Sequence, residues 1–422
     1  MPKVSGSGSV VNVFVGQAGN QLGTSFLNFV AAGDHEGSVD ASIPILFEEQ
    51  ANLSLTARAV MIDMEPKVII QQRREAEKKG SYAYAKHSVI NAQSGSANNW
   101  ALGYLRHGPM HRESLEEGFR KRAEAADLLE GFMTWQSLAG GTGSGMGAYV
   151  AELLRECYPK SALLSVVVWP HMSGEVTIQS YNALFSLDCL YPVCDGIISL
   201  ENDAAKRVCR QRLGLEKPSH ADLNSVFALQ LSGALLPTDG LSSMLLPPLR
   251  ILCPLPTHKL ISTRAIPQCA SRMREYNSNS WSQISKHLYQ MHIDNGCIDE
   301  GLNWRLQASS SNFRNRSIGA VLVGRGIDAQ TFDVAPWQSS LLYSLRPSFL
   351  FNHSPNWREK SAFLLATNTG VVEPLETCLQ VGSRLLEKNA YLFHYEKYGL
   401  SKDDIIAMFA GMESTCRAYQ NL

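Results

Sequence analysis

The chain has no excess of charge of either sign. Its 38 Lys and Arg residues are balanced by 39 Asp and Glu residues, which gives a formal net charge of −1 over 422 residues. A protein without a basic field has no general attraction for the phosphate backbone of nucleic acids. We therefore expect no nucleic-acid partner.

Long apolar runs are also missing. The most apolar stretches, such as residues 163–169, are much shorter than the roughly 20 residues that a membrane-spanning helix needs. Residues 1–9 carry no apolar core of the kind found in a signal peptide. The sequence thus predicts neither membrane insertion nor secretion.

Cysteine is present, but without the spacing that would give it a structural role. There are nine cysteines, an odd number, and the closest two are Cys189 and Cys194, so there is no C-x-x-C pair. Disulfide frameworks and zinc sites both depend on paired or clustered cysteines. The pattern indicates reduced thiols in a cytoplasmic protein, and the length suits two or three domains.

The most distinctive stretch is Ala-Gly-Gly-Thr-Gly-Ser-Gly-Met-Gly at residues 139–147. A bulky apolar run typical of a buried strand precedes it at 131–138, and residues 148–157 have the apolar spacing of an amphipathic helix. A glycine loop between a strand and a helix can turn backbone N–H groups toward a phosphate, and the helix N-terminus adds about half a positive charge. Alternatively, the glycines form a turn that lets the strand and helix pack closely.

This loop matches neither of two common phosphate-binding motifs. No Lys follows its last glycine, which excludes a Walker P-loop, and Met146 occupies the place of the third glycine of a dinucleotide fingerprint. A dinucleotide-dependent Rossmann enzyme is still an alternative, but it is disfavoured. The next strand ends at Trp169-Pro170 and not at the acidic residue that would bind a ribose.

Two further polar loops follow predicted strands. Residues 16–23, Gly-Gln-Ala-Gly-Asn-Gln-Leu-Gly, come after a strand at 10–15 and can hold another part of the same ligand or serve as a packing turn. Asp63 and Glu65 come after a strand at 57–62, where carboxylates suit a hydrated Mg²⁺ beside phosphates. Alternatively, Asp63 caps a helix whose first turn contains Pro66.

Strands and helices alternate along the first half of the chain, with further strands at 162–170 and 196–200 and a charged helix expected from 113 to 130. This order predicts an α/β fold with a doubly wound parallel sheet. Ligands of such sheets lie at the carboxyl ends of the strands, where the polar loops noted above would meet. A long buried helix is predicted at 222–236, and helices at 376–386 and 402–412.

Taken together and in order, these loops resemble the tubulin family. The stretches at 16–23, 63–66 and 140–145 occur at the family's spacing, and the similarity runs from about residue 10 to the end. The residues around Asn98-Asn99-Trp100 and Trp169-Pro170 look most like the delta branch. The resemblance implies a GTP-binding protein with four parts. These are a nucleotide domain (10–218), a long core helix (219–238), an α+β intermediate domain (239–366) and a C-terminal helical pair (367–422).

The resemblance also implies which residues bind GTP or GDP and Mg²⁺. Glu65 would reach the metal through water, with Asp63 beside it. Asn98 and Asn99 would line the γ-phosphate side. Asn202 and Asn224 would hydrogen-bond to the guanine. The other residues implied at the nucleotide are Gln17, Ala18, Ser137, Gly140, Gly141, Thr142, Gly143, Ser144, Gly145, Gln179 and His220.

Several positions depart from the alpha and beta members of the family. Ala18 stands in place of a Cys, and Ala97 in place of a glycine, so the loop at Ala97 is expected to approach the phosphate less closely. Gln179 replaces a Glu expected at the ribose. His220 replaces an aromatic residue that stacks on the base, and His stacks more weakly.

The last departure concerns hydrolysis. In polymerising tubulins, an acidic residue just after the core helix reaches the next subunit's nucleotide. The matching residues 243–250 contain no carboxylate, Pro247 falls at the position of the acid, and Asp239 is the other candidate for the role. We therefore expect GTP binding with weak or no GTPase activity.

The leading hypothesis from the resemblance is a structural protein of the cytoskeleton, located at the centriole or basal body. Its partners would be other tubulins or centriolar and basal body proteins. The alternative is a polymer-forming GTPase subunit like alpha- or beta-tubulin.

Overall fold

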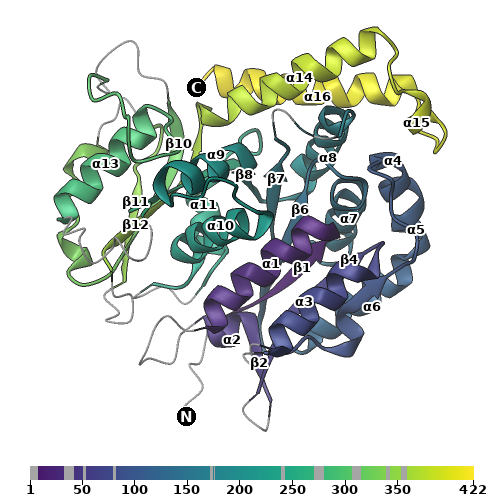
Figure 1. The fold of residues 1–422 in the computed structure, drawn as a ribbon, viewed down its shortest axis with the longest axis horizontal. Helices are drawn as coiled ribbons and strands as arrows, with labels where there is room; N and C mark the ends of the chain where they lie inside the picture. Colours follow the sequence, from purple (N-terminus) through teal and green to yellow (C-terminus); the bar gives the residue numbers. More distant parts are fainter. Residues whose placement is uncertain are drawn as a thin grey trace.

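The computed structural model describes residues 8–32, 42–50, 54–78, 82–171, 174, 176–238, 243–269, 280–306, 315–338, 343–352 and 359–422. Within them, a ten-stranded sheet runs through the molecule with helices on both faces (Figure 1). In sheet order, its strands are β11 (Ser348–Asn352), β10 (Ser317–Arg325), β12 (Ser361–Asn368), β9 (Leu260–Ile266), β8 (Gly196–Glu201), β7 (Ala162–Trp169), β6 (Leu129–Ser137), β1 (Ser9–Val15), β4 (Ala59–Asp63) and β5 (Val89–Asn91). Neighbouring strands are parallel except at β12, which is antiparallel to both β10 and β9. A separate antiparallel pair joins β2 (Phe47–Glu49) to β3 (Leu55–Ala57).

Strand β1 shows why both faces of the sheet are covered. Its residues are all buried, and they alternate between two cores. Val10 and Phe14 enter one core, while Val11 and Val13 enter the other. Helices of the first core are α1 (Gly16–Ala31), α2 (Ile43–Leu46), α3 (Pro66–Lys78), α9 (Asn202–Arg207), α10 (His220–Leu235) and α11 (Leu246–Leu252). Helices of the second are α4 (Trp100–Leu102), α6 (Arg112–Glu124), α7 (Gly147–Cys157), α8 (Gln179–Val193), α14 (Val372–Glu387), α15 (Phe393–Glu396) and α16 (Lys402–Gln420).

The remaining part packs around a third core. Inward residues of β10 and β12 meet helix α13 (Trp281–Ile293) there. The two long C-terminal helices, α14 and α16, lie side by side against α8 (Figure 1). In the described part of the chain, no helix has the length and apolar character needed to span a membrane.

The predicted α/β fold with a mainly parallel, doubly wound sheet is confirmed. One predicted boundary is wrong: the helix expected from 113 to 130 is present as α6 but ends at Glu124, and residues 129 and 130 already belong to β6. The sheet continues across the predicted domain boundary, because residues 197–199 of β8 pair with residues 260–262 of β9. The four domain limits stay predictions, and residue 239 lies outside the described residues.

Candidate nucleotide site

Six parallel strands end at one edge of the sheet. They are neighbours in the order β8, β7, β6, β1, β4 and β5, so their carboxyl ends share that edge. The polar loops predicted from the sequence therefore do meet, as the parallel topology requires. The last residues of these strands are Glu201, Trp169, Ser137, Val15, Asp63 and Asn91.

Two helix N-termini come together at this edge. Helix α1 begins at Gly16, whose φ of 71° is in the left-handed region that favours glycine. A Cβ on Gly16 would lie 2.8 Å from the backbone nitrogen of Gly143. Gly143 belongs to a π-helical turn, Thr142–Met146, that leads into α7. Because the first N–H groups of a helix have no acceptor within it, both positive helix ends face this place, and both suit an anion.

The side chains next to Gly16 follow the same geometry. Gln17 is exposed in the first turn of α1, and Ala18 is half-buried. Gln17 is thus free to contact a ligand at the junction of the two helices. Ala18 has only its backbone groups and a methyl with which to contact a ligand.

The glycine loop packs closely against residues 96–99. A Cβ on Gly141 would lie 2.6 Å from the backbone nitrogen of Asn99, and the hydroxyls of Ser96 and Thr142 are 3.0 Å apart. Gly140 is different. Among the described residues, a Cβ there would have one atom within 4 Å, Oδ1 of Asn98, at 3.7 Å. The space beside Gly140 is therefore open, with Asn98 at its edge.

Two serines hold the shape of this loop. Oγ of Ser137 accepts a hydrogen bond from the backbone nitrogen of Ala139 at 3.3 Å. The hydroxyl of Ser144 donates to the carbonyl of Gly140. Ser144 is buried, whereas Ser137 is half-buried. Contact with a nucleotide stays a prediction for both.

The loop before Trp100 has an unusual backbone. Ala97 and Asn98 have φ angles of 45° and 54°, in the left-handed region. Ala97 thus adopts a conformation that glycine would take more easily, at a cost of about 1 kcal/mol. The left-handed conformation is thus formed here without glycine. Asn98 is exposed there, and Asn99 is buried.

Asp63 and Glu65 have different roles in the structure. Oδ1 of buried Asp63 accepts a hydrogen bond from the backbone nitrogen of Glu65 at 3.3 Å, and α3 begins at Pro66. This bond closes a turn just before the helix, and it does not reach an N–H group of α3 itself, so capping by Asp63 stays a prediction. Burial raises the pKa of Asp63 to about 6. Glu65 is exposed, and its carboxylate lies next to Gly95, on the loop after β5. Its free carboxylate fits a contact with hydrated Mg²⁺, since such ions keep several waters.

The residues predicted for the base and sugar lie on neighbouring elements. Asn202 opens α9 and is half-buried, and Asn224 is half-buried on α10, which packs beside α9. His220, the first residue of α10, is exposed. Gln179 donates from Nε2 to the carbonyl of His171 at 2.8 Å, so part of its amide is already bonded within its own loop.

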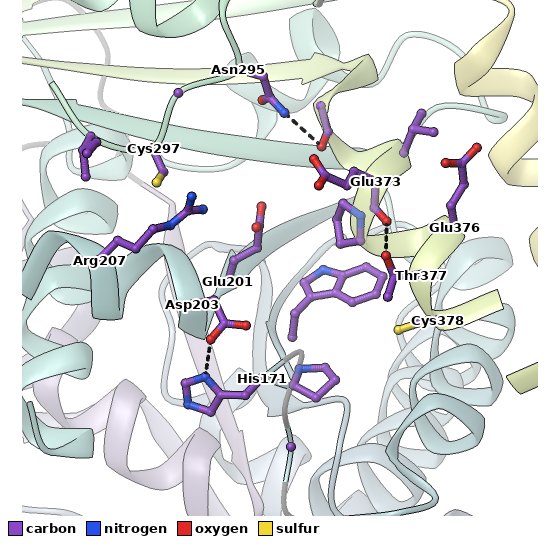
Figure 2. A pocket seen from close by; sticks show the side chains of 18 of the residues that line it. His171, Glu201, Asp203, Arg207, Asn295, Cys297, Glu373, Glu376, Thr377 and Cys378 are labelled. Carbon is purple, nitrogen blue, oxygen red and sulfur yellow. Dashed lines mark hydrogen bonds and ion pairs between the residues drawn. The ribbon is translucent and has the colours of Figure 1, made fainter. Parts of the chain in front are cut away.

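A cavity of about 850 Å³ adjoins this region but is separate from the glycine loop. Glu201 and Asp203 line it, while Asn202 and residues 137–145 do not. Figure 2 shows these two carboxylates entering the cavity from the β8–α9 corner, with Glu373 of α14 facing them. Nδ1 of His171 lies 2.7 Å from Oδ1 of Asp203 and ties the β7–α8 loop to α9. The glycine loop predicted to bind phosphate therefore lies beside this cavity and does not line it.

Sequence reasoning missed Asn182, which joins the loops of the site. It is fully buried on α8 and donates from Nδ2 to the carbonyls of Asn98, at 2.8 Å, and Ala139, at 2.7 Å. The available signal was an amide within an apolar helical stretch, since a buried amide must find partners. The sequence alone does not say which partners these are.

Comparisons with known proteins identify the family of the chain. Residues 9–210 match the model of the Tubulin/FtsZ family, GTPase domain. Over 98% of its length, the chain is 33% identical to the tubulin delta chain of Canis lupus familiaris, all of which is covered. The chain belongs to the tubulin family. It is 32% identical to the tubulin delta chain of Homo sapiens, over 98% of this chain and 100% of the relative. It is 28% identical to the tubulin beta-2 chain of Geotrichum candidum, over 97% of this chain and 93% of the relative. The resemblance inferred from the loops, including its delta-like details, is confirmed.

Proposed function

We propose that this tubulin-family protein binds GTP and GDP, with Mg²⁺, at the edge where α1 and the glycine loop meet. The observation that carries the proposal is the convergence of two helix N-termini beside the open space at Gly140. We further propose that it acts in the cytoskeleton in the manner of the delta chains it is similar to, at the centriole or basal body. Its partners there would be other tubulins or centriolar proteins.

The first experiment identifies the nucleotide. The purified protein is denatured, and the released small molecules are separated by chromatography. Guanine nucleotide supports the proposal. Recovery of NAD or FAD would instead support the Rossmann alternative and reject the proposal.

Gly140→Val is expected to abolish nucleotide binding without unfolding the protein. The new side chain enters the open space beside Asn98, where the phosphates are proposed to lie, and its Cβ has no backbone atom within 4 Å among the described residues other than its chain neighbours. We expect the Kd for GTP to rise by at least about 100-fold, which corresponds to about 2.7 kcal/mol. The measurement is equilibrium binding of a fluorescent GTP analogue, with thermal unfolding as a check of the fold.

Gly140→Ala is the matched control, because its Cβ makes only an ordinary contact with Asn98. It should bind far more tightly than the Val variant. Unchanged affinity in a folded Val variant would place the phosphates elsewhere.

Glu65→Ala is expected to weaken the dependence of GTP binding on Mg²⁺. The exposed carboxylate is proposed to hold the ion through water, so its loss should raise the Kd for Mg–GTP about tenfold, or about 1.4 kcal/mol. GDP binding measured with a chelator should change little. Glu77→Ala, which removes an exposed charge further along α3, is the control. Equal losses with and without Mg²⁺ would mean that Glu65 supports the fold only.

GTP turnover per molecule is expected to stay flat as the protein concentration rises. Helix α11 carries Pro247 and Pro248 in its first turn and has no carboxylate to orient water for a neighbouring subunit. Asp239, the other candidate, lies outside the described residues. Turnover is measured across a concentration series, alone and with alpha/beta-tubulin. A steep rise with its own concentration, lost when both prolines are replaced, would support a polymer-forming GTPase instead.

A further inference from the structure

The buried amide of Asn182 connects the candidate site to the C-terminal helical region. Nδ2 donates its two hydrogens to the carbonyls of Asn98 and Ala139. Oδ1 accepts from the backbone nitrogen of Trp100, at 3.2 Å, and from the hydroxyl of Tyr395, at 2.8 Å. An amide side chain has two donor hydrogens and two acceptor positions, so Asn182 is fully used. Two of its partners belong to the loops around Gly140, and one belongs to α15.

Asn99 makes a second connection between the same two regions. Its Oδ1 accepts from the backbone nitrogen of Leu102 and caps α4, at 3.1 Å. Its Nδ2 donates to the carbonyl of His394 at 2.7 Å. Asn98 and Asn99, which are adjacent in the loop beside the phosphate space, are thus tied to His394 and Tyr395, which are adjacent in α15. Two parallel links make a shift of one region difficult without a shift of the other.

The segment that receives these links is strained and carries exposed aromatic residues. Residues 388–401 join α14 to α16. Asn389 and Tyr391 have φ angles of 51° and 62°, and this conformation is unfavourable for a bulky residue such as Tyr. Tyr391 is 43% exposed and Phe393 is 69% exposed. Buried contacts, including those of Tyr395, therefore hold the segment in a shape that its own backbone does not favour.

We propose that Asn182 is a positioning residue that couples the terminal phosphate of the nucleotide to the surface formed by Tyr391 and Phe393. The inference rests on the proposed nucleotide site. A phosphate beside Gly140 lies against Asn98, whose backbone carbonyl is bonded to Asn182. Since Asn182 is buried and has no spare donor or acceptor, a shift of that carbonyl moves the amide or breaks one of its bonds. The bond to Tyr395 then changes, and the strained segment changes its position or mobility.

Hydrogen exchange of the full-length protein tests this coupling. Exchange of residues 389–399 is measured by mass spectrometry with no nucleotide, with GDP and with a non-hydrolysable GTP analogue. In the wild type, we expect the exchange rates with GDP and with the GTP analogue to differ by about threefold or more. Tyr395→Phe removes only the hydroxyl that bonds to Asn182. It should reduce that difference to less than half while both affinities stay within about threefold.

Tyr181→Phe separates coupling from simple packing. Tyr181 also lies buried on α8, and its hydroxyl donates to the carbonyl of Ala390 at 3.4 Å in the same segment. Among the described residues, the Tyr181 hydroxyl bonds to neither the loop at 96–99 nor the loop at 137–145. Its loss should therefore change exchange equally with both nucleotides and keep their difference. If Tyr395→Phe also keeps the full difference, the inference is overturned. It is also overturned if both nucleotides bind to the wild type without any difference in exchange, and the proposed function then still stands. If neither nucleotide binds, the proposed function fails as well.

Discussion

Glu130→Ala is expected to lower the free energy of unfolding by about 3–5 kcal/mol. Glu130, 7% exposed at the start of β6, binds the N-terminal side of α11 with both carboxylate oxygens. The bonds come from the hydroxyl of Ser243 and from the backbone nitrogens of Met244, Leu245 and Leu246, at 2.6, 3.1, 2.6 and 2.8 Å. Bonds from N–H groups to a charged oxygen are stronger than neutral ones, and the substitution leaves buried N–H groups without a partner. Urea unfolding measures the loss.

Two further variants and one binding measurement sharpen this test. Ser243→Ala removes a single bond and should cost only about 1 kcal/mol, and Glu130→Gln should fall between the two. Nucleotide affinity of the folded Glu130→Ala variant should match the wild type, because Glu130 lies near the start of β6 while the candidate site lies at the opposite end, after Ser137. A loss below 1 kcal/mol for Glu130→Ala would show that water can replace the carboxylate. A selective loss of nucleotide binding would contradict the assigned geometry.

Glu130 also shows where prediction from the sequence fails. Residues 113–130 are rich in helix-forming charged residues, so a helix through Glu130 was the natural prediction. Glu130 is instead fixed by partners more than 110 positions away in the chain. The helix propensity of these residues is overridden here, because β6 is buried in the sheet and Glu130 accepts hydrogen bonds from the N–H groups that lead into α11. Nothing within a local window of sequence contains that information.

Features that depend on local pattern were predictable. The strand Ala162–Trp169 begins where predicted and ends one residue before the predicted end at Pro170. A short run of bulky apolar residues is typical of a strand buried inside a parallel sheet. The meeting of the polar loops at one edge also followed from the sequence, since strands joined by helices must be parallel. The loop that contains Gly140 and Gly143 was recognisable as well, because its glycines lie between a strand pattern and a helix pattern.

The exact role of each polar side chain was not predictable. For Asp63 the sequence predicts either helix capping or Mg²⁺ binding, and only the fold shows that its oxygen accepts a hydrogen bond from the backbone nitrogen of Glu65. Gln179 was expected at a ribose, and part of its amide is bonded to His171. Asn182 was not singled out, although it holds two loops of the site. Hydrogen-bond partners of buried groups come from segments distant in the sequence, and helical periodicity does not encode them.

The stability that His292 contributes is expected to disappear as the pH falls from 7 to 4. His292 is fully buried on α13, with Nε2 3.0 Å from the hydroxyl of Ser317 and its ring parallel to that of Tyr343. Burial, together with the nearby charge of Arg264, lowers its pKa to about 3. The folded protein therefore keeps the ring neutral at a pH where the unfolded chain binds a proton. Because the unfolded state binds more protons below its pKa of about 6.5, acid favours unfolding.

His292→Phe isolates this effect, because Phe fills the site without titrating. The free energy of unfolding of the wild type should fall relative to the variant by about 2 kcal/mol between pH 7 and 5, and by about 3 kcal/mol by pH 4.

Asp63 and Asp188 affect the pH dependence of stability in the opposite sense. Burial raises the pKa of each to about 6, so the folded state takes up protons as the pH falls through 6 and gains stability. Both carboxyls are present in both proteins, so their contribution cancels in the difference. Urea unfolding of the two proteins at each pH gives that difference, and a value that stays constant from pH 7 to 4 would show that the ring of His292 takes up its proton within the folded protein.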